Sequence, residues 1–177
     1  MHKDIERVLI SERELREKVA LVGAQISRDY KGKEPIFVGV LKGCFIFMAD
    51  LMRVVEVDCS MDFMSVSSYS GTSSTGAVKI NKDLNGDIEG RHVIIVEDIL
   101  DSGVTLCYLK NYLLGRNPAS IAIVTLMDKP ARRKADILAD YSCFEVPDAF
   151  VVGYGLDYNE KYRNLPYIGV LKPEIYS

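Results

Sequence analysis

The chain lacks several features that would mark whole classes of protein. Its 177 residues contain no tryptophan, two histidines and four cysteines. The cysteines, Cys44, Cys59, Cys107 and Cys143, stand far apart and form no C-x-x-C pair. This spacing predicts neither a zinc site nor a disulfide framework. We interpret the four thiols as reduced and mostly buried.

Long apolar runs and an excess of positive charge are also absent. No apolar stretch approaches the roughly 18 residues of a membrane span, and residues 1–18 contain no apolar signal-peptide core. The formal net charge is -3 and the pI is near 5.5, so a broad basic face for nucleic acid is not expected. We therefore expect a cytoplasmic protein that binds neither nucleic acid nor membrane and holds any phosphate locally.

What the chain does have is 48% hydrophobic residues, enough for one substantial core and a single domain over residues 1–177. A capping box at Ser11 and Glu14 begins a helix that ends before Gly32 and Pro35. Apolar patterns predict further helices at 45–52 and 104–114, and strands at 36–41, 57–63, 78–80, 92–96, 121–126 and 150–153. This alternation favours an α/β fold with a mainly parallel twisted sheet, helices on both faces and ligands beyond the strands' carboxyl ends.

Two of the predicted segments have unusual side chains. In residues 57–63 the apolar side chains of Val57, Cys59, Met61 and Phe63 alternate with polar or small ones, which is typical of a strand with one face in the core. Residues 67–76 read SSYSGTSSTG, in which only Tyr69 is not Ser, Thr or Gly. Such a segment buries little apolar surface, so we expect a mobile loop.

Three carboxylates, Glu97, Asp98 and Asp101, directly follow the strand predicted at 92–96. Two like charges about 4 Å apart repel by roughly 1 kcal/mol in water and about 4 kcal/mol near a protein surface. A divalent cation or a set of sugar hydroxyls would compensate this repulsion. Because neighbouring side chains of a strand point to opposite faces, Glu97 and Asp98 are expected to have separate partners.

The next residues, Ser102, Gly103, Val104 and Thr105, lead into the predicted helix. They offer small side chains, a flexible glycine and free backbone N–H groups at a positive helix end, which together suit a phosphate without a lysine. An acidic strand end and a Ser-Gly turn that only cap a helix are an equally good interpretation of these residues alone.

The whole string VIIVEDILDSGVTL, residues 93–106, resembles the diphosphate-sugar motif of the type I phosphoribosyltransferase family. The resemblance implies that Glu97 and Asp98 bind the ribose hydroxyls of 5-phosphoribosyl 1-diphosphate, directly or with help from Mg²⁺. It also implies that residues 101–105 take the 5'-phosphate. Some relatives have lysine at the position of Val104, which leaves the subclass open.

Two other segments extend the resemblance toward the diphosphate. The turn Leu41, Lys42, Gly43 matches the one that binds pyrophosphate through backbone N–H groups, and its Leu-Lys peptide is commonly cis in the family. An ordinary strand-helix turn with an exposed lysine is the alternative. Ser68 and Tyr69 match the Ser-Tyr pair of a lid loop, here about 67–77, that closes over the diphosphate and excludes water. A solvated linker is the alternative here.

The C-terminal third is similar to the purine pocket of bacterial hypoxanthine-guanine phosphoribosyltransferases. By this resemblance the pocket and a small hood come from about 129–177 and part of the N-terminus, and the purine-binding residues are Lys129, Phe150, Val151 and Asp157. Lys129 would donate to the 6-oxo group, Phe150 would stack on the base and Val151 would pair with its edge through the backbone. Asp157 would also hold a second Mg²⁺, and Arg163 would contact the diphosphate. A solvated basic run at 129–134 and a core aromatic at Phe150 are the alternatives.

The resemblance implies a purine-salvage enzyme that transfers the phosphoribosyl group to N9 of hypoxanthine or guanine, giving IMP or GMP and pyrophosphate. Asp101 is the candidate general base for the purine N7 proton, or a group that stabilises positive charge on the base. A homodimer or homotetramer is implied as well. The alternatives are a xanthine-preferring enzyme and a regulator that senses the diphosphate sugar and binds nucleic acid, although the chain has no added nucleic-acid-binding segment.

Overall fold

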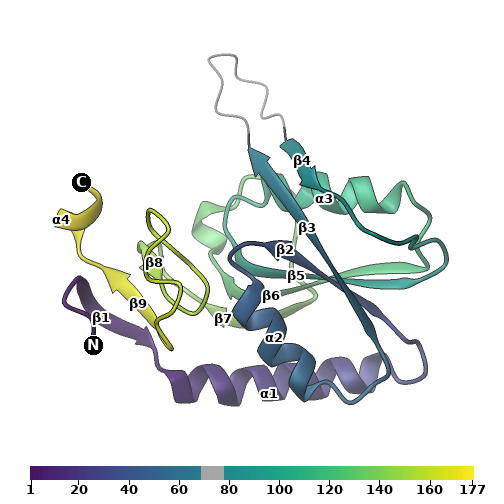
Figure 1. Ribbon diagram of the computed structural model, residues 1–177, viewed down its shortest axis with the longest axis horizontal. Helices are drawn as coiled ribbons and strands as arrows, with labels where there is room; N and C mark the ends of the chain where they lie inside the picture. Colours follow the sequence, from purple (N-terminus) through teal and green to yellow (C-terminus); the bar gives the residue numbers. More distant parts are fainter. Residues whose placement is uncertain (69–77) are drawn as a thin grey trace.

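The computed structural model describes residues 1–68 and 78–177, and its largest element is a six-stranded sheet (Figure 1). The strands lie in the order β4-β3-β2-β5-β6-β7. Their bounds are β2 (Ile36–Leu41), β3 (Ser60–Ser68), β4 (Val78–Lys82), β5 (His92–Leu100), β6 (Ser120–Asp128) and β7 (Tyr141–Glu145). All neighbours pair in parallel except β3 and β4, so the predicted mainly parallel sheet is confirmed.

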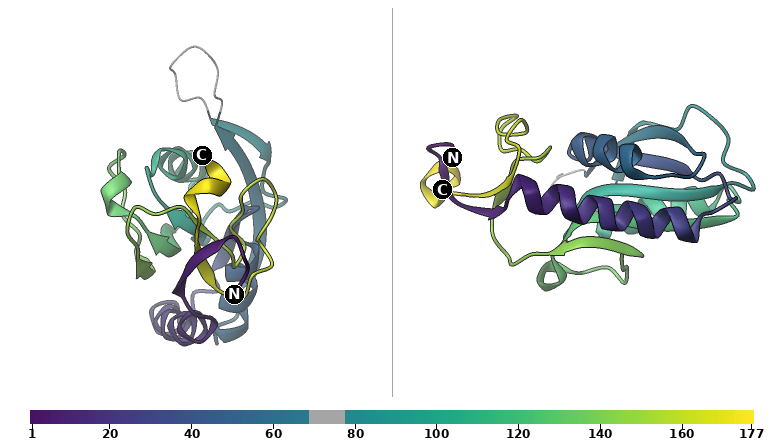
Figure 2. Two further views of the ribbon diagram at one scale, coloured as in Figure 1. Left: turned by 90° about the vertical axis from the view of Figure 1, so that its left-hand side faces the viewer. Right: turned by 90° about the horizontal axis from the view of Figure 1, so that it is seen from below.

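Helices cover both faces of this sheet. α1 (Glu12–Asp29) and α2 (Phe45–Val54) pack on one face, and α3 (Val104–Leu114) packs on the other. The right-hand view of Figure 2 shows α1 running along its face of the sheet. The predicted capping box begins α1, because the Glu14 amide donates to the Ser11 hydroxyl at 3.3 Å and the Ser11 amide donates to the Glu14 carboxylate at 2.8 Å.

The two central strands are apolar on both faces, as their sequences predict. Phe37 and Ile94 point into the core beneath α1 and α2, whereas Val38 and Ile95 point into the core beneath α3. Each of these four side chains is fully buried. Strands without a polar face cannot lie at the surface, so β2 and β5 form the middle of the sheet.

A second, three-stranded sheet forms the hood, which we define as β1 (Ile5–Ile10), β9 (Ile168–Leu171) and β8 (Val151–Val152). Its strands are antiparallel, and both chain termini lie at this end of the molecule (Figures 1 and 2). The hood of terminal segments implied by the resemblance is therefore present. The 3-10 turn η1 (Pro130–Arg132) follows β6, and the short helix α4 (Pro173–Tyr176) follows β9.

Five of these elements, β1, β7, β9, η1 and α4, were not predicted from the sequence. In β1 only the two end residues, Ile5 and Ile10, are buried, and its pairing with β9 is interrupted by two register shifts. In β7 only Cys143 is buried, because β7 is an edge strand. Short strands of this kind show no period of two, which is the pattern by which strands are recognised.

The strand expected at 57–63 begins later, and its most buried residues, Asp62 and Met64, lie on the face opposite to the predicted one, although Phe63 still packs against the core. β3 starts at Ser60, which is aligned with Ile36 of β2, so Val57 and Cys59 belong to the connection from α2. Met61 is 48% exposed, whereas Asp62 is only 8% exposed. Burial of Asp62 is satisfied by hydrogen bonds from the amides of Phe63 and Asn85, both at 2.7 Å.

Two predicted boundaries also differ from the structure. β5 continues in register with β6 as far as Leu100, so Glu97 and Asp98 lie on the strand and not beyond it. β3 includes Ser67 and Ser68, where the predicted loop was to begin. The rest of that loop, residues 69–77, lies outside the described residues.

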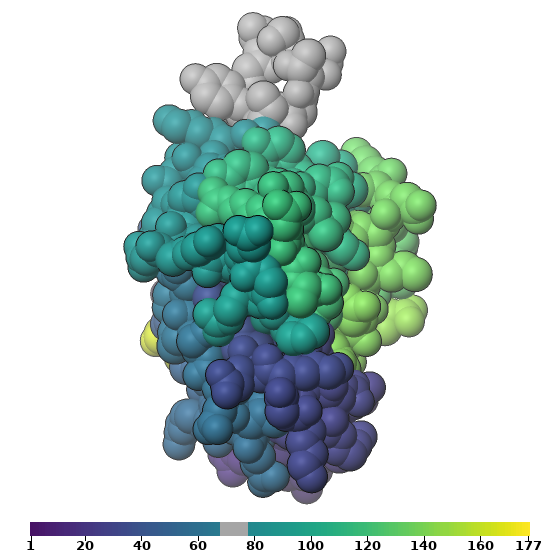
Figure 3. Space-filling model, turned by 90° about the vertical axis from the view of Figure 1, so that its right-hand side faces the viewer, coloured from purple at the N-terminus to yellow at the C-terminus, as the bar shows by residue number. Residues whose placement is uncertain are grey.

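Figure 3 shows the end of the molecule opposite the hood. Segments from the early, middle and later parts of the chain lie side by side there, where the connections into the amino ends of the parallel strands meet. The carboxyl ends of these strands therefore face the hood, and the hood lies over the region where ligands are expected.

The structure also bears on the protein classes considered from composition. All four cysteines are free, but only Cys44 and Cys143 are buried, whereas Cys59 and Cys107 are half-buried near the surface. The expectation of mostly buried thiols therefore holds for two of the four. Among the helices of the described residues, none combines the length and hydropathy that crossing a bilayer requires.

Candidate active site

A cavity of about 250 Å³ lies at the carboxyl ends of β2 and β5. Seven residues predicted from separate segments line it together: Leu41, Gly43, Glu97, Asp98, Asp101, Gly103 and Thr105. Its remaining lining is largely apolar and includes Val40, Val66 and Ile99. The turn after β2 and the acidic end of β5 are therefore two walls of one site.

Glu97 and Asp98 are directly linked, because the Glu97 carboxylate accepts a hydrogen bond from the Asp98 backbone amide at 3.3 Å. Burial, followed by the negative charge of Asp98, raises the pKa of Glu97 well above its ordinary value. The two residues line one cavity and not two separate faces of the sheet, while separate partners for them remain a prediction. The pairing of β5 with β2 ends at Val96, and beyond that point both side chains reach the same cavity.

Asp98 is held against the backbone of Gly43. A β-carbon placed on Gly43 would lie 1.6 Å from the Asp98 carboxylate oxygen Oδ2, so only glycine fits this position. The Leu41–Lys42 peptide that precedes it is cis. Burial raises the pKa of Asp98, whereas the amide of Ile99, at 2.7 Å, and the charge of Arg163 act in the opposite direction.

The predicted phosphate loop, residues 101–105, lies on the other side of the cavity. Gly103 has a φ of +75° and stands directly before α3. The Ser102 hydroxyl accepts from the Val104 amide at 3.4 Å, and the Asp101 and Val104 side chains are exposed. The loop therefore combines a left-handed glycine with the positive end of an 11-residue helix, an arrangement that suits an anion.

Arg133 supports this loop and was not predicted from the sequence. Its guanidinium donates to the carbonyl of Asp101 at 2.9 Å, to that of Leu100 at 3.3 Å and to the carboxylate of Asp128. The next residue, Lys134, donates its amide to the Ser102 carbonyl at 2.9 Å. In the sequence Arg133 is one member of a basic run, and only the fold distinguishes it from its exposed neighbours.

Lys129 lies at the end of β6, next to the phosphate loop. Its side chain is 9% exposed, and its Nζ donates to the Ala149 carbonyl at 2.6 Å and lies 3.8 Å from Asp148. Burial lowers the pKa of Lys129, whereas the carboxylates of Asp148 and Asp101 raise it. The alternative of a solvated basic run therefore does not apply to Lys129.

Phe150 stands beside Lys129 because it follows Ala149 in the chain. It is 38% exposed, so it is not a core aromatic. Its ring stacks on Tyr176 of α4, with centroids 4.6 Å apart, and meets the ring of Tyr158 edge-on at 5.5 Å. Val151, by contrast, is buried in the hood, where β8 pairs with β9.

Arg163 and Asp157 occupy the segment after β8. The Arg163 guanidinium lies 2.9 Å from the Asp157 carboxylate and donates to the Gly155 carbonyl at 2.8 Å. Its Nε is buried and has no hydrogen-bond partner within the described residues, and its charge lowers the pKa of Asp98. An acceptor bound in the site would satisfy this donor.

Glu160 links this segment to the turn after β2, and the sequence did not single it out. It lies 3.1 Å from the Lys42 ammonium and 3.4 Å from Arg163, and both cations lower the pKa of Glu160. Lys42 thus points toward the C-terminal segment. Of the predicted lid pair, Ser68 ends β3, whereas Tyr69 lies outside the described residues.

Comparison with known proteins identifies the family to which the chain belongs. A family model described as the phosphoribosyl transferase domain matches residues 10–159, which include both walls of the cavity. The chain belongs to this family. The resemblance found in residues 93–106 is therefore confirmed over most of the chain.

Relatives of similar length are found among bacterial enzymes. The chain is 58% identical to a hypoxanthine-guanine phosphoribosyltransferase of Bacillus subtilis, over 100% of this chain and 99% of that protein. A solved structure of a hypoxanthine phosphoribosyltransferase from Staphylococcus aureus superposes with a TM-score of 0.97 at 53% identity, covering 100% of this chain and 97% of that one.

A longer relative contains the same unit as one part. The chain is 58% identical to a bifunctional protein TilS/HprT of Listeria monocytogenes, over 100% of this chain. It spans only 28% of the length of that relative.

Proposed function

We propose that the chain is a purine-salvage enzyme that transfers the 5-phosphoribosyl group from 5-phosphoribosyl 1-diphosphate to N9 of hypoxanthine or guanine. The products are IMP or GMP and pyrophosphate. The observation that carries the proposal is the single cavity in which the half-buried carboxylate pair, the glycine turn and the phosphate loop meet. The activities for which relatives 58% and 53% identical are named support the same reaction.

Different parts of the site bind different groups of the sugar substrate. Glu97 and Asp98 accept hydrogen bonds from the ribose hydroxyls, and the backbone of residues 101–105 holds the 5'-phosphate at the start of α3. The turn at Gly43 and the guanidinium of Arg163 hold the diphosphate. This assignment places each anionic group beside backbone N–H groups or a cation. Because Asp98 lies against the Gly43 turn, the diphosphate also needs a cation to offset that carboxylate.

Mg²⁺ fits the carboxylate pair and would neutralise the leaving pyrophosphate when bound. Within residues 1–68 and 78–177 no three possible ligand side chains gather at one point, so the protein alone supplies an incomplete set. Mg²⁺ commonly uses one or two carboxylates and completes its octahedron with substrate oxygens and water. Glu97 and Asp98 are the proposed ligands of one ion, and Asp157 is the proposed ligand of a second.

The base is proposed to bind between the hood and the end of β6. Phe150 presents an exposed ring for stacking, the backbone of Val151 pairs with the purine edge, and Lys129 donates to the 6-oxo group. A protonated lysine can donate but cannot accept, so it disfavours the 6-amino group of adenine. Asp101 is proposed to accept the N7 proton or to stabilise positive charge on the base, and its influence on the pKa of Lys129 supports this role.

The proposed function is tested by incubating the purified protein with the diphosphate sugar, Mg²⁺ and hypoxanthine, guanine, xanthine or adenine. We expect IMP and GMP, each with one equivalent of pyrophosphate, and little product from the other two bases. Chelation of Mg²⁺ should stop the reaction and added Mg²⁺ should restore it. The absence of a nucleotide from all four bases would contradict the proposal, and fastest turnover of xanthine would contradict the base assignment.

A change at Lys129 tests base selection. Lys129→Gln should lower kcat/KM for hypoxanthine by about 10- to 100-fold, the size of one lost charged hydrogen bond. Turnover of adenine should rise relative to hypoxanthine, because the new amide oxygen can accept from an amino group. Lys134→Gln, an exposed lysine of the same run, is the control. Equal kcat/KM for hypoxanthine in the two variants would remove Lys129 from the base site.

Two further properties belong to the proposal. A homodimer or homotetramer is implied by the resemblance and can be measured by sedimentation equilibrium. A cytoplasmic location agrees with the four free cysteines, because disulfides are rare where thiols are kept reduced.

A further inference from the structure

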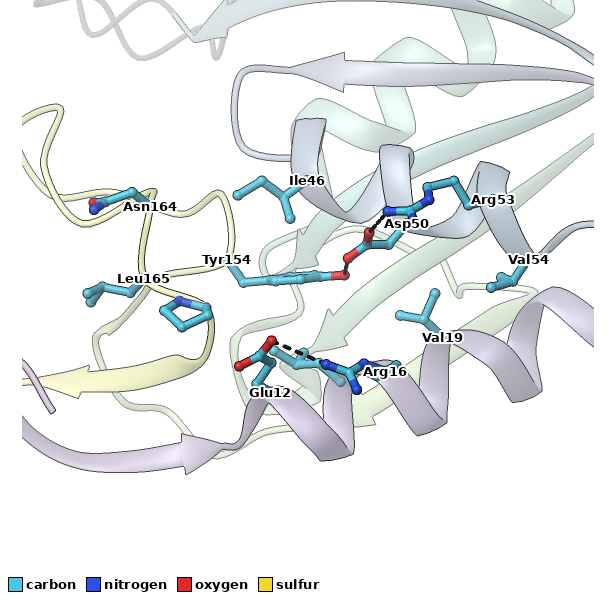
Figure 4. A pocket seen from close by; sticks show the side chains of 12 residues that line it. Glu12, Arg16, Val19, Ile46, Asp50, Arg53, Val54, Tyr154, Asn164 and Leu165 are labelled. Atoms are coloured by element: carbon cyan, nitrogen blue, oxygen red, sulfur yellow. Dashed lines mark hydrogen bonds and ion pairs between the residues drawn. The ribbon is translucent and has the colours of Figure 1, made fainter.

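A second cavity, of about 720 Å³, lies between α1, α2 and the segment after β8 (Figure 4). Its α2 wall directly follows the turn at residues 41–43, which we call the diphosphate turn. The ring of Tyr154 crosses this space from the segment after β8 toward α2, where its hydroxyl reaches Asp50. The hydroxyl donates to the Asp50 carboxylate at 2.6 Å. The tyrosine is only 6% exposed, whereas the Asp50 side chain is half-exposed and also lies 3.8 Å from the Arg53 guanidinium.

The backbone of Tyr154 is held in an unusual conformation. Its φ is +49°, a left-handed value that few residues other than glycine adopt and that costs about 1–3 kcal/mol. The amide of Tyr154 donates to the Leu165 carbonyl at 2.8 Å. Such a conformation persists where surrounding contacts over-determine it, and here those contacts are the buried ring, the Asp50 bond and the Leu165 bond.

Asp50 connects Tyr154 to the turn that precedes α2. The helix begins at Phe45, directly after Gly43 and Cys44, so a helical segment fixes the position of Asp50 relative to that turn. Burial, followed by the hydrogen bond to Asp50, raises the pKa of Tyr154. The hydroxyl is therefore a donor throughout the neutral range.

The residue after Tyr154 touches the same turn from the other side. Gly155 has a φ of +105°, and a β-carbon on it would lie 2.2 Å from the carbonyl oxygen of Gly43. The Gly155 amide donates to the Arg163 carbonyl at 3.0 Å, and the Gly155 carbonyl accepts from the Arg163 guanidinium at 2.8 Å. The backbone of Gly155 thus lies between the Gly43 turn and Arg163 and contacts both.

We propose that Tyr154 and Asp50 form a positioning pair that sets the distance between the Gly43 turn and Arg163, and thereby the affinity for the diphosphate end of the sugar substrate. This inference rests on the proposed function, because it assumes that the turn and Arg163 hold the diphosphate. The pair touches neither the base residues nor the carboxylate pair. Its effect should therefore be confined to diphosphate binding.

Three variants test the pair in the full-length protein. Tyr154→Phe and Asp50→Ala remove the hydrogen bond, and each should raise KM for the diphosphate sugar by about tenfold, the upper range for one lost bond. The Kd of Mg²⁺-pyrophosphate, measured by calorimetry without turnover, should rise equally. Asp50→Asn keeps an oxygen that accepts from the tyrosine and should stay within about twofold of wild type. KM for hypoxanthine should change by less than about twofold in all three.

The chain offers a matched control. Tyr141 of β7 donates to Asp29 of α1 at 2.7 Å, which is the same kind of bond far from the diphosphate turn. Tyr141→Phe should leave both KM values unchanged. The inference is overturned if Tyr154→Phe raises both KM values alike, lowers only the melting temperature, or behaves as Tyr141→Phe does.

The inference and the proposed function can fail separately. A wild-type protein that binds Mg²⁺-pyrophosphate but forms no nucleotide would contradict the activity, while the binding comparison among variants would still decide the role of the pair. A normal activity with unchanged pyrophosphate affinity in Tyr154→Phe would contradict the pair alone.

Discussion

Asp101→Ala should lower kcat by about 10²- to 10⁴-fold, the usual range for loss of a general acid-base group. KM for the diphosphate sugar should change far less. Removing the side chain leaves the loop in place, because the Asp101 carbonyl is held by Arg133 at 2.9 Å and the Ser102 carbonyl by the amide of Lys134 at 2.9 Å. The exposed carboxylate makes no bond that supports the fold within the described residues.

Steady-state kinetics with hypoxanthine and the diphosphate sugar each varied will measure this effect. Asp136→Ala, which changes an exposed aspartate on the segment after η1, is the control and should be within about twofold of wild type. An unchanged kcat in Asp101→Ala would remove Asp101 from the mechanism. A raised KM with normal kcat would instead make it a residue that binds substrate and transition state equally.

Gly43→Ala should reduce kcat/KM by about 100-fold or more, since a displacement of about 1 Å in an active site can have this effect. The added β-carbon would lie 1.6 Å from Oδ2 and 2.7 Å from Cγ of Asp98. Either the Asp98 carboxylate or the turn must move, and both belong to the proposed site. KM for the diphosphate sugar should rise as well, because the turn and Asp98 bind its two halves.

The same substitution at Gly86 is a suitable control. A β-carbon there meets nothing within 4 Å, so Gly86→Ala should keep wild-type kinetics. Thermal unfolding of both variants separates a local displacement from a loss of fold. A folded Gly43→Ala protein with kinetics like those of Gly86→Ala would show that Asp98 and the turn are not in close contact.

Much of the fold follows from local patterns in the sequence. The capping box at Ser11, the apolar run of β2 and the helix after Gly103 are each encoded within a few residues, so they were predicted at nearly their observed bounds, whereas β5 was predicted at its observed start but continues to Leu100. β1 and β9 were missed because β1 is a strand only through its pairing with β9, across most of the chain length, and β9 through its pairing with β1 and β8. β3 was misplaced by alternation alone, since the buried Asp62 depends on donors from residues 63 and 85.

The candidate site shows the same division. The acids Glu97, Asp98 and Asp101 and the phosphate loop are contiguous in sequence, so residue type and order were enough to predict their chemistry. The supports of that site, Arg133 among them, are not distinguished by residue type or spacing. They act through contacts with residues distant in sequence, as in the bond from Arg133 to the Asp101 carbonyl.

The sequence by itself determined the family, the parallel sheet and the identity of the acidic and phosphate-binding segments, because each depends on short-range patterns of polarity and residue size. Only the tertiary structure decided that Asp98 lies against Gly43, that the charge of Arg163 lowers the pKa of Asp98 and that Tyr154 joins Asp50. Such contacts join segments up to 104 residues apart, and they exist only once the sheet and hood have brought those segments together.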